Sequence, residues 1–415
     1  MSTSSRLPIQ GAKLLAVTAI VVLALSGCGG GTTSPSASVS AALSANVLAS
    51  PSAVASATSI ASASPRPNGV FSTTGSMITP RSGSSTSTLL ADGRVLATGG
   101  SDVPDAISAA EIYDPATGQW TKTGSMVKGH SYHTATLLKD GRVLIVGGCD
   151  TNTTAEMYDP ATGKFSPLGK VALDYPCDST ATLLNDGRVL IAGGYGRDVD
   201  PASKLADLFD PATGKFTRTG SLHTARSHAQ AVLLPDGRVL VIGGQQGVSA
   251  AGRSDEVDLA SSEIYDPATG KFSDAAKMET PRTDFSATLL TSGKVLVAGG
   301  GDVNVAGFGL GSAELYDPTT DKFSPTGSMT HSRINPTESG EWTSLSTSPL
   351  ADGRVLFVGG TGGAETTAEI YDPATGKFSA TTSPSKDQIP YGLPAVTLKD
   401  GRVLMPGAPS LLYTP

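Results

Sequence analysis

Hydrophobic and polar positions recur in the same order seven times along most of the chain. Each repeat contains an apolar run such as Val143 to Val146, with an Asp-Gly-Arg element or a variant before it and, in six copies, a glycine pair after it. A segment such as Ala-Glu-Ile-Tyr follows, then Asp-Pro and a further aromatic residue. This order predicts four strands per repeat, of which the second is buried on both faces.

The turns between these strands are specified by their own residues. Asp-Gly favours a type I′ hairpin, whose central residues need a positive φ, and Pro followed by Gly shapes the turn after the third strand. The variant Ser292-Gly293 keeps the glycine that this reading requires. The seven copies lie 46 to 60 residues apart and begin at Asp92, Asp140, Asp186, Asp236, Ser292, Asp352 and Asp400.

The two ends of the repeat region complement each other. The last repeat stops at Pro415 after three strands, whereas Phe71 to Met77 has the pattern of a fourth strand without the first three. Inserting the N-terminal strand into the last repeat gives seven complete four-stranded sheets. The sequence therefore predicts an all-β fold, a seven-bladed β-propeller over residues 69–415 whose last blade is closed by the N-terminal strand.

Spacing distinguishes the two faces of the predicted propeller. The turn glycine and the glycine pair are six residues apart in six copies, so the face with the Asp-Gly and Asp-Pro turns does not vary. On the other face, the distance from the second glycine to the Tyr or Phe runs from 10 in the second copy to 21 in the fourth. Variable loops on a rigid scaffold are where ligands usually bind. The repeated tyrosines and Asp-Gly-Arg elements, in contrast, are expected to serve the fold.

The first 68 residues follow a different pattern. Basic residues Arg6 and Lys13 precede a short apolar run, Leu14 to Leu25, which predicts a signal peptide over residues 1–27. Leu25 to Cys28 resembles a bacterial lipobox, which implies a diacylglycerol on Cys28. Residues 28–68 are rich in Ser and Ala and predict a disordered tether. We therefore expect export and anchoring to a bacterial membrane, at the cell surface or in the periplasm, through the lipid alone.

The repeats resemble those of kelch proteins and galactose oxidase. The marks of that family are the glycine pair, the Tyr-Asp and the following aromatic at fixed spacing, and the resemblance covers residues 71 to 415. Only the last copy departs from it, with Pro406-Gly407 in place of the glycine pair. The chain is thus similar to a bacterial kelch-repeat lipoprotein, and the resemblance implies a kelch-type propeller.

Candidate functional residues must differ between repeats. All five histidines are expected in connections between strand four and the next strand one, and the loops of the variable face also contain aromatic and acidic residues. A glycan or protein ligand is the partner we expect, with no catalysis and no cofactor, on a monomer. The candidate ligand-binding residues are Tyr132, His133, Tyr175, Tyr195, His228, Asp284 and Trp342.

A copper-radical oxidase is the alternative. Galactose oxidase holds copper through two His and two Tyr, one Tyr crosslinked to Cys, and Tyr132-His133 resembles its Tyr-His pair. The rest of that pattern is not matched, because no C-terminal domain beyond the propeller supplies a further histidine. Under this alternative the copper ligands would be His130, Tyr132, His133 and His228.

Cysteine usage predicts a disulfide, and the net charge excludes two classes of binding partner. Once Cys28 is assigned to lipid, Cys149 and Cys177 remain, on the variable face of adjacent blades, and an oxidising compartment favours a disulfide between them. The net charge of -7 argues against nucleic acid and against electrostatic adhesion to anionic lipid.

Overall fold

The computed structural model describes residues 69–102, 105–149, 154–171, 176–195, 202–250, 253–301, 309–333, 345–360, 367–385 and 394–415. These residues belong to one compact unit. The signal peptide, the tether and Cys28 lie outside the described residues. Tyr175 and Trp342 do as well.

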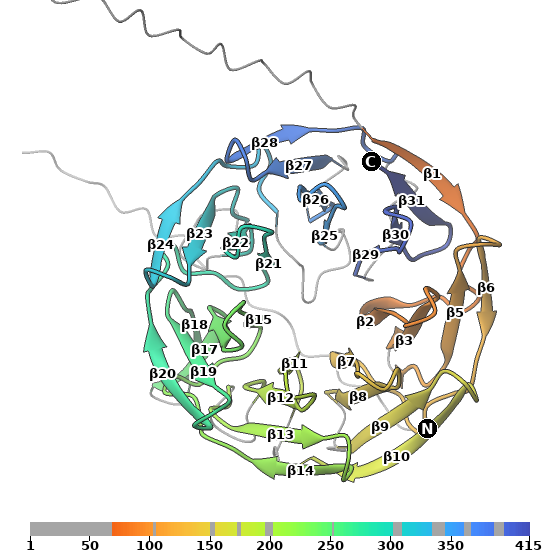
Figure 1. Ribbon diagram of the computed structural model, residues 1–415, viewed down its shortest axis with the longest axis horizontal. Coiled ribbons are helices and arrows are strands. Elements are labelled where there is room, and N and C mark those ends of the chain that lie inside the picture. Colours follow the sequence, from red (N-terminus) through yellow and green to blue (C-terminus); the bar gives the residue numbers. More distant parts are fainter. Residues whose placement is uncertain are drawn as a thin grey trace, which may run out of the picture. The chain divides into compact units, whose positions relative to one another are not determined.

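Seven antiparallel sheets are arranged around a central axis (Figure 1). In each sheet the strands follow one another from the axis outward, apart from the last sheet, in which the outermost strand comes from the N-terminal end. We number the blades one to seven in chain order of their inner strands. The described chain is therefore the seven-bladed β-propeller that the repeats predict.

Blades one to three contain β2 (Ser82–Leu89), β3 (Val95–Asp102), β5 (Ala110–Asp114) and β6 (Gln119–Lys122); β7 (His133–Leu137), β8 (Val143–Gly147), β9 (Thr154–Asp159) and β10 (Lys164–Lys170); and β11 (Thr180–Leu183), β12 (Val189–Ala192), β13 (Ala206–Asp210) and β14 (Lys215–Arg218). A short β4 (Asp105–Ala106) also pairs with β3.

Blades four to six contain β15 (Gln230–Leu233), β16 (Val239–Ile242), β19 (Ser262–Asp266) and β20 (Lys271–Ala275); β21 (Ser286–Leu289), β22 (Val295–Ala298), β23 (Ala313–Asp317) and β24 (Lys322–Pro325); and β25 (Ser346–Pro349), β26 (Val355–Val358), β27 (Ala368–Asp372) and β28 (Lys377–Ala380). The long connection in blade four forms a separate hairpin of β17 (Gln245–Ala250) and β18 (Arg253–Asp258).

Blade seven is closed as predicted. It contains β29 (Val396–Thr397), β30 (Val403–Met405) and β31 (Ser410–Thr414), and β1 (Val70–Thr74) adds the outer strand. The register runs from Val70 opposite Thr414 to Thr74 opposite Ser410. The strand ends before Met77 because the Gly75 N–H leaves the sheet and donates to the Gly118 carbonyl of blade one, at 2.9 Å.

The core lies between neighbouring blades. The second strand of each blade begins with a buried apolar run, as in Val143 to Val146 of β8. The repeated tyrosines fill the space between blades: Tyr113 of blade one is buried against Leu404 and Leu412 of blade seven, and its hydroxyl hydrogen-bonds the Thr74 hydroxyl at 2.9 Å. This confirms their structural role. Among the described residues no helix is long and apolar enough to cross a membrane.

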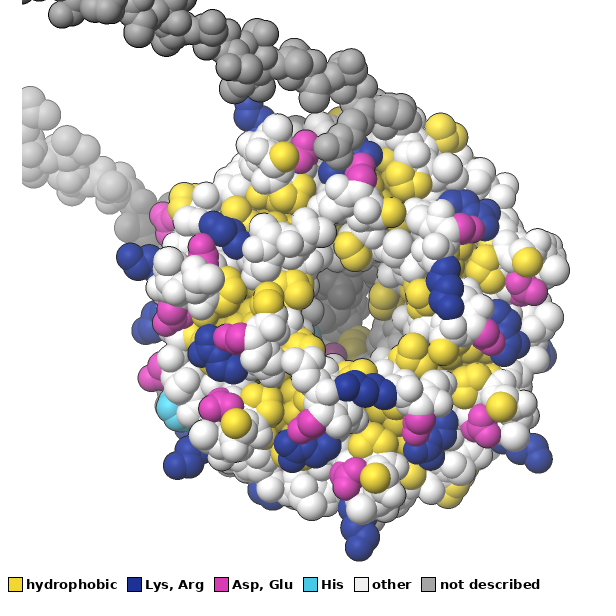
Figure 2. Space-filling model, in the orientation of Figure 1, with side chains coloured by type: hydrophobic (Ala, Val, Ile, Leu, Met, Phe, Trp, Pro, Cys, Tyr) yellow, Lys and Arg dark blue, Asp and Glu magenta, His cyan; other side chains and the backbone are white. Residues whose placement is uncertain are grey.

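The face with the Asp-Gly-Arg turns repeats one polar pattern around a hollow centre (Figure 2). In blade one, Asp92 accepts hydrogen bonds from the Arg94 N–H at 3.0 Å and from its Nε at 2.8 Å, while Gly93 has a φ of 95°. The Asp–Arg pairs in the turns of blades two, three, four and seven are similarly exposed. Such exposed pairs shape turns and contribute little stability.

Candidate functional site

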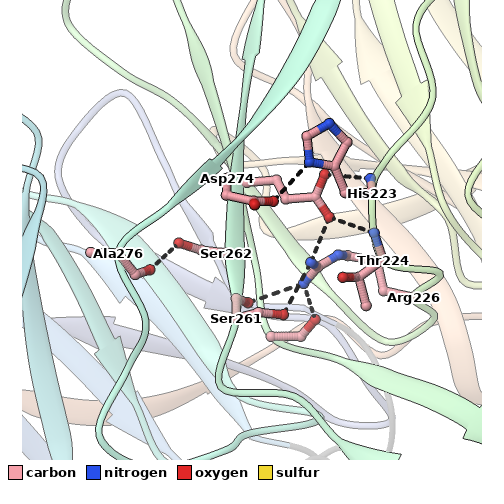
Figure 3. Close-up of polar contacts among 9 residues, drawn as sticks. His223, Thr224, Arg226, Ser261, Ser262, Asp274 and Ala276 are labelled. Carbon is pink, nitrogen blue, oxygen red and sulfur yellow. Dashed lines mark hydrogen bonds and ion pairs between the residues drawn. The ribbon is translucent and has the colours of Figure 1, made fainter.

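A buried arginine braces the start of blade four. The guanidinium of Arg226 donates to the Gly243 carbonyl at 2.9 Å and to Glu263 Oε1 at 2.8 Å (Figure 3). The Glu263 carboxylate also accepts the backbone N–H groups of His223 at 2.7 Å and Thr224 at 3.0 Å. A buried charge is tolerated only with such partners. Three further blades use the same brace, in the pairs Arg81–Glu111, Arg282–Glu314 and Arg333–Glu369.

Blades two and three depart from this brace. In blade two His130 takes the place of the arginine and lies 2.5 Å from the Gly147 carbonyl and 3.2 Å from Glu156. In blade three the corresponding residue is Pro176, which has no side-chain donor, and the acid is Asp207, paired at 3.0 Å with Arg218. The arginine–glutamate brace is therefore replaced by other residues in two adjacent blades.

A disulfide joins the two altered blades. Cys149 follows the glycine pair of blade two, Cys177 follows Pro176 of blade three, and their Cα atoms are 4.7 Å apart. A covalent link thus lies beside the position at which blade three lacks the arginine brace.

Five residues with a left-handed backbone surround the axis on the same face. They are Ser84, Tyr132, Asp178, His228 and Asp284, with φ of 70°, 55°, 51°, 52° and 51°. Each stands nine residues before the turn glycine of its blade, at or just before the innermost strand. We call these five residues the axial ring. Non-glycine residues in this conformation are uncommon and gather at functional sites.

Backbone hydrogen bonds connect members of the axial ring across blades. The Tyr132 N–H donates to the Ser84 carbonyl at 2.9 Å, and the Asp178 N–H donates to the Tyr132 carbonyl at 3.2 Å. The main chain is therefore fixed by the fold, whereas the side chain is different in almost every blade. This combination is what a scaffold needs in order to present varied chemistry at a constant position.

The disulfide-linked sector of the axial ring contains a poorly solvated acid. The Asp178 carboxyl lies 3.5 Å from His228 Nε2, and the Tyr195 ring meets the His228 ring edge-on with centroids 5.4 Å apart. Burial raises the pKa of Asp178 to about 7 and lowers the pKa of His228 to about 4. Burial thus favours the neutral form of both groups.

Four of the sequence-predicted ligand residues lie in the axial ring or contact it, whereas His133 lies in the core. Tyr132, His228 and Asp284 belong to the axial ring, and Tyr195 contacts His228. Ser84 and Asp178 were missed, although Asp284 was not, because the candidates were chosen by residue type rather than by position in the repeat. The register would have found them, since both stand nine residues before a turn glycine.

His133 differs from the other candidates because it is part of the core. It begins β7 rather than lying in a connection, and its Nε2 contacts the hydroxyls of Thr98 at 2.9 Å and Thr86 at 3.1 Å. A Cβ added to Gly99 would lie 2.5 Å from the His133 ring, just as one on Gly243 would lie 2.8 Å from Phe285. His133 thus fills the space that phenylalanine fills in blade five.

The proposed copper ligands do not fit a shared metal centre. Both ring nitrogens of His130 already contact Gly147 and Glu156 in the blade-two brace. His133 is buried, and burial lowers the pKa of its imidazole to about 3. Tyr132 and His228 belong to the axial ring of different blades. The geometry therefore gives no ligand set through which copper chemistry can be derived.

Two other groups of described side chains are close enough to share a metal ion. One is Cys149, Cys177 and Asp178, whose sulfurs are bonded to each other. The other is His223, Glu263 and Asp274, of which Glu263 is buried, whereas His223 and Asp274 are exposed and lie side by side in Figure 3. Glu263 makes the same hydrogen bonds there as its counterparts in blades without the histidine, so its role is the brace.

Comparisons with known proteins agree with this fold. The kelch motif matches residues 82–127. An F-box/kelch-repeat protein of Arabidopsis thaliana is 37% identical over 87 residues, a stretch that covers 20% of this chain and 22% of that protein.

Two solved structures share the architecture at low sequence identity. A fungal alcohol oxidase of the AA5 family in complex with copper is 16% identical, with a TM-score of 0.61 over 84% of this chain and 76% of that one. YjhT is 15% identical, with a TM-score of 0.55 over 74% of this chain and 99% of that one. The repeats and the closed ring, with these similarities, show that the described chain is a seven-bladed β-propeller that contains a kelch motif.

Proposed function

We propose that this protein is an exported, lipid-anchored binding module that recognises a glycan at the axial ring without catalysing a reaction. The observation that carries the proposal is the axial ring itself, in which one strained backbone position presents Ser, Tyr, Asp, His and Asp. Hydroxyl, carboxyl and imidazole groups match sugar hydroxyls, and aromatic rings such as Tyr132 and Tyr195 match the apolar faces of sugars.

The anchoring part of the proposal rests on the N-terminal sequence. The apolar run from Leu14 to Leu25 and the following Cys28 supply the expected processing site. Expression of the full chain in a bacterium with labelled fatty acid should label the wild type and leave Cys28→Ser unlabelled. Equal labelling of both would contradict lipidation at Cys28.

Glycan binding is tested with the purified full-length protein on a glycan array. His228→Asn keeps a residue that tolerates the left-handed backbone but removes the imidazole, and we expect it to weaken binding. His223→Asn is the matched control, because His223 is an exposed histidine outside the axial ring. Capture of a defined protein ligand with no glycan signal would favour the protein class instead. Stoichiometric copper with peroxide release would overturn the non-catalytic proposal.

A further inference from the structure

The Asp178 carboxyl is bonded differently from the buried glutamates. Glu263 receives two backbone N–H groups and a guanidinium, all at 2.7–3.0 Å. Within the described chain, no N–H group donates to the carboxyl of Asp178. His228 lies 3.5 Å away, the neighbouring Cys177 sulfur is in a disulfide, and 19% of the side chain is exposed. The side chain is half-buried, so this carboxyl has fewer donors than the buried glutamates while a ligand can still reach it.

A proton donor that carries positive charge would satisfy this carboxyl best. A carboxylate removed from water is stabilised by a charge-assisted hydrogen bond. His228 is poorly suited to supply that charge, because burial lowers the pKa of its imidazole to about 4. Its Nδ1 contacts only the neighbouring Ser227 hydroxyl, at 3.4 Å. The titratable groups recorded around Asp178 in the described chain are His228 and, beyond it, Tyr195.

The charge of the axial ring favours a cation. Its five members include two acids, Asp178 and Asp284, and no Lys or Arg. The nearby Arg226 is committed to Glu263. The Tyr195 ring packs against His228, which itself lies 3.5 Å from the acid, and the main chain of Tyr132 is bonded to that of Asp178. Aromatic rings beside a carboxylate are a common setting for ammonium groups.

We infer that Asp178, with His228 and Tyr195, is the recognition point for an ammonium group, so that the ligand is a saccharide with a free amine. This inference rests on the proposed glycan binding and assigns its ligand class. The ammonium donates to the Asp178 carboxyl, while neighbouring sugar hydroxyls contact His228 and the tyrosines.

Titration calorimetry on the full-length protein near pH 6.5 tests this assignment. The probes are D-glucosamine, N-acetyl-D-glucosamine, which has the same ring with the amine blocked, and D-glucose. We expect glucosamine to bind at least about tenfold more tightly than the other two, since a hydrogen bond between charged groups is stronger than one between neutral groups. Asp178→Asn should remove this preference, and asparagine is readily accommodated at a left-handed position.

Proton release gives a readout that needs no variant. Because burial raises the pKa of Asp178 to about 7, the acid is mostly protonated at pH 6.5, and an ammonium at the carboxyl should expel that proton. The heat measured in buffers of different ionisation enthalpy should therefore differ for glucosamine. Saccharide binding with no preference for the amine and no proton release would overturn the inference and leave glycan binding standing. No saccharide binding at all, on the array or in solution, would overturn both proposals.

Discussion

At the scale of single residues, the axial ring combines one constant backbone conformation with side chains that vary between blades. Tyr132, Asp178 and His228 share one left-handed conformation and differ completely in chemistry. The neighbouring position shows the opposite behaviour, since His133 and Phe285 pack on equivalent glycines and both serve the core. Adjacent residues of one repeat therefore have separate roles, one in the axial ring and one in the core.

The buried His133 predicts an acid sensitivity of the fold. The lowered pKa, about 3, means that the folded protein leaves this ring unprotonated where the unfolded chain takes up a proton below about pH 6.5. Stability is therefore lost as the pH falls from about 6.5 toward 3, by at most about 1.4 kcal/mol per pH unit. His133→Phe should flatten this dependence in denaturant titrations at several pH values, though His228 still contributes with the same sign. An unchanged pH profile would contradict this account.

The two kinds of Arg–acid pair should respond differently to truncation. Arg226→Ala leaves Glu263 buried without its cation and should cost about 3–5 kcal/mol of unfolding free energy. Arg94→Ala removes an exposed partner of Asp92 and should cost less than about 1 kcal/mol. Chemical denaturation of both variants measures the difference. Similar losses in the two would show that the brace is not the stronger device.

Residue chemistry alone predicted only part of the site. Histidines and aromatics were recognised as candidates, which identified Tyr132 and His228 but also drew in His133. Asp284 was among the candidates but Asp178 was not, because Asp178 is distinguished by the lack of N–H donors to its carboxyl, and that depends on neighbouring blades. Burial and the solvation of a carboxyl are tertiary properties, so they could not be read from the repeat.

At the scale of elements, strands and turns were predictable because their determinants are local. The apolar second strands and the closing strand occur where the repeat predicts them. The hairpins also occur at Asp-Gly, but the predicted type I′ turn was wrong: in blade one the Gly93 N–H donates to the Leu90 carbonyl, and the glycine alone of the Asp-Gly pair has a positive φ. The hairpin of β17 and β18 was foreseen only as a long connection, since its residues lack alternation strong enough to predict strands.

Removal of the closing strand should destabilise the whole ring. A chain that starts at residue 79 lacks β1 and the buried Met77, and it exposes the edge of β31. We expect a loss of more than about 3 kcal/mol relative to a chain that starts at residue 69, measured by thermal and urea unfolding. A synthetic peptide of residues 69–78 should restore part of the loss. Equal stability of the two chains would contradict closure by β1.

At the scale of the whole molecule, the disulfide links two blades that the arginine brace does not support. It spans a sequence separation of 28 residues, for which the chain-entropy account gives about 3–4 kcal/mol. The double variant Cys149→Ser with Cys177→Ser should therefore unfold at lower denaturant concentration and bind glycan more weakly, because Asp178 adjoins Cys177. Peptide mapping without reductant checks the bond in the exported protein, and two free thiols would contradict it.

The register of β1 against β31 places the two ends of the propeller side by side, with Val70 opposite Thr414. A short linker could therefore join them, and the chain could be opened at an exposed turn of another blade, such as Asp236-Gly237, to give a circular permutant with the same set of contacts. The chain can then begin at a different blade. The contacts that stabilise the ring and form the axial ring depend on the order of the blades around the circle, which the permutation keeps.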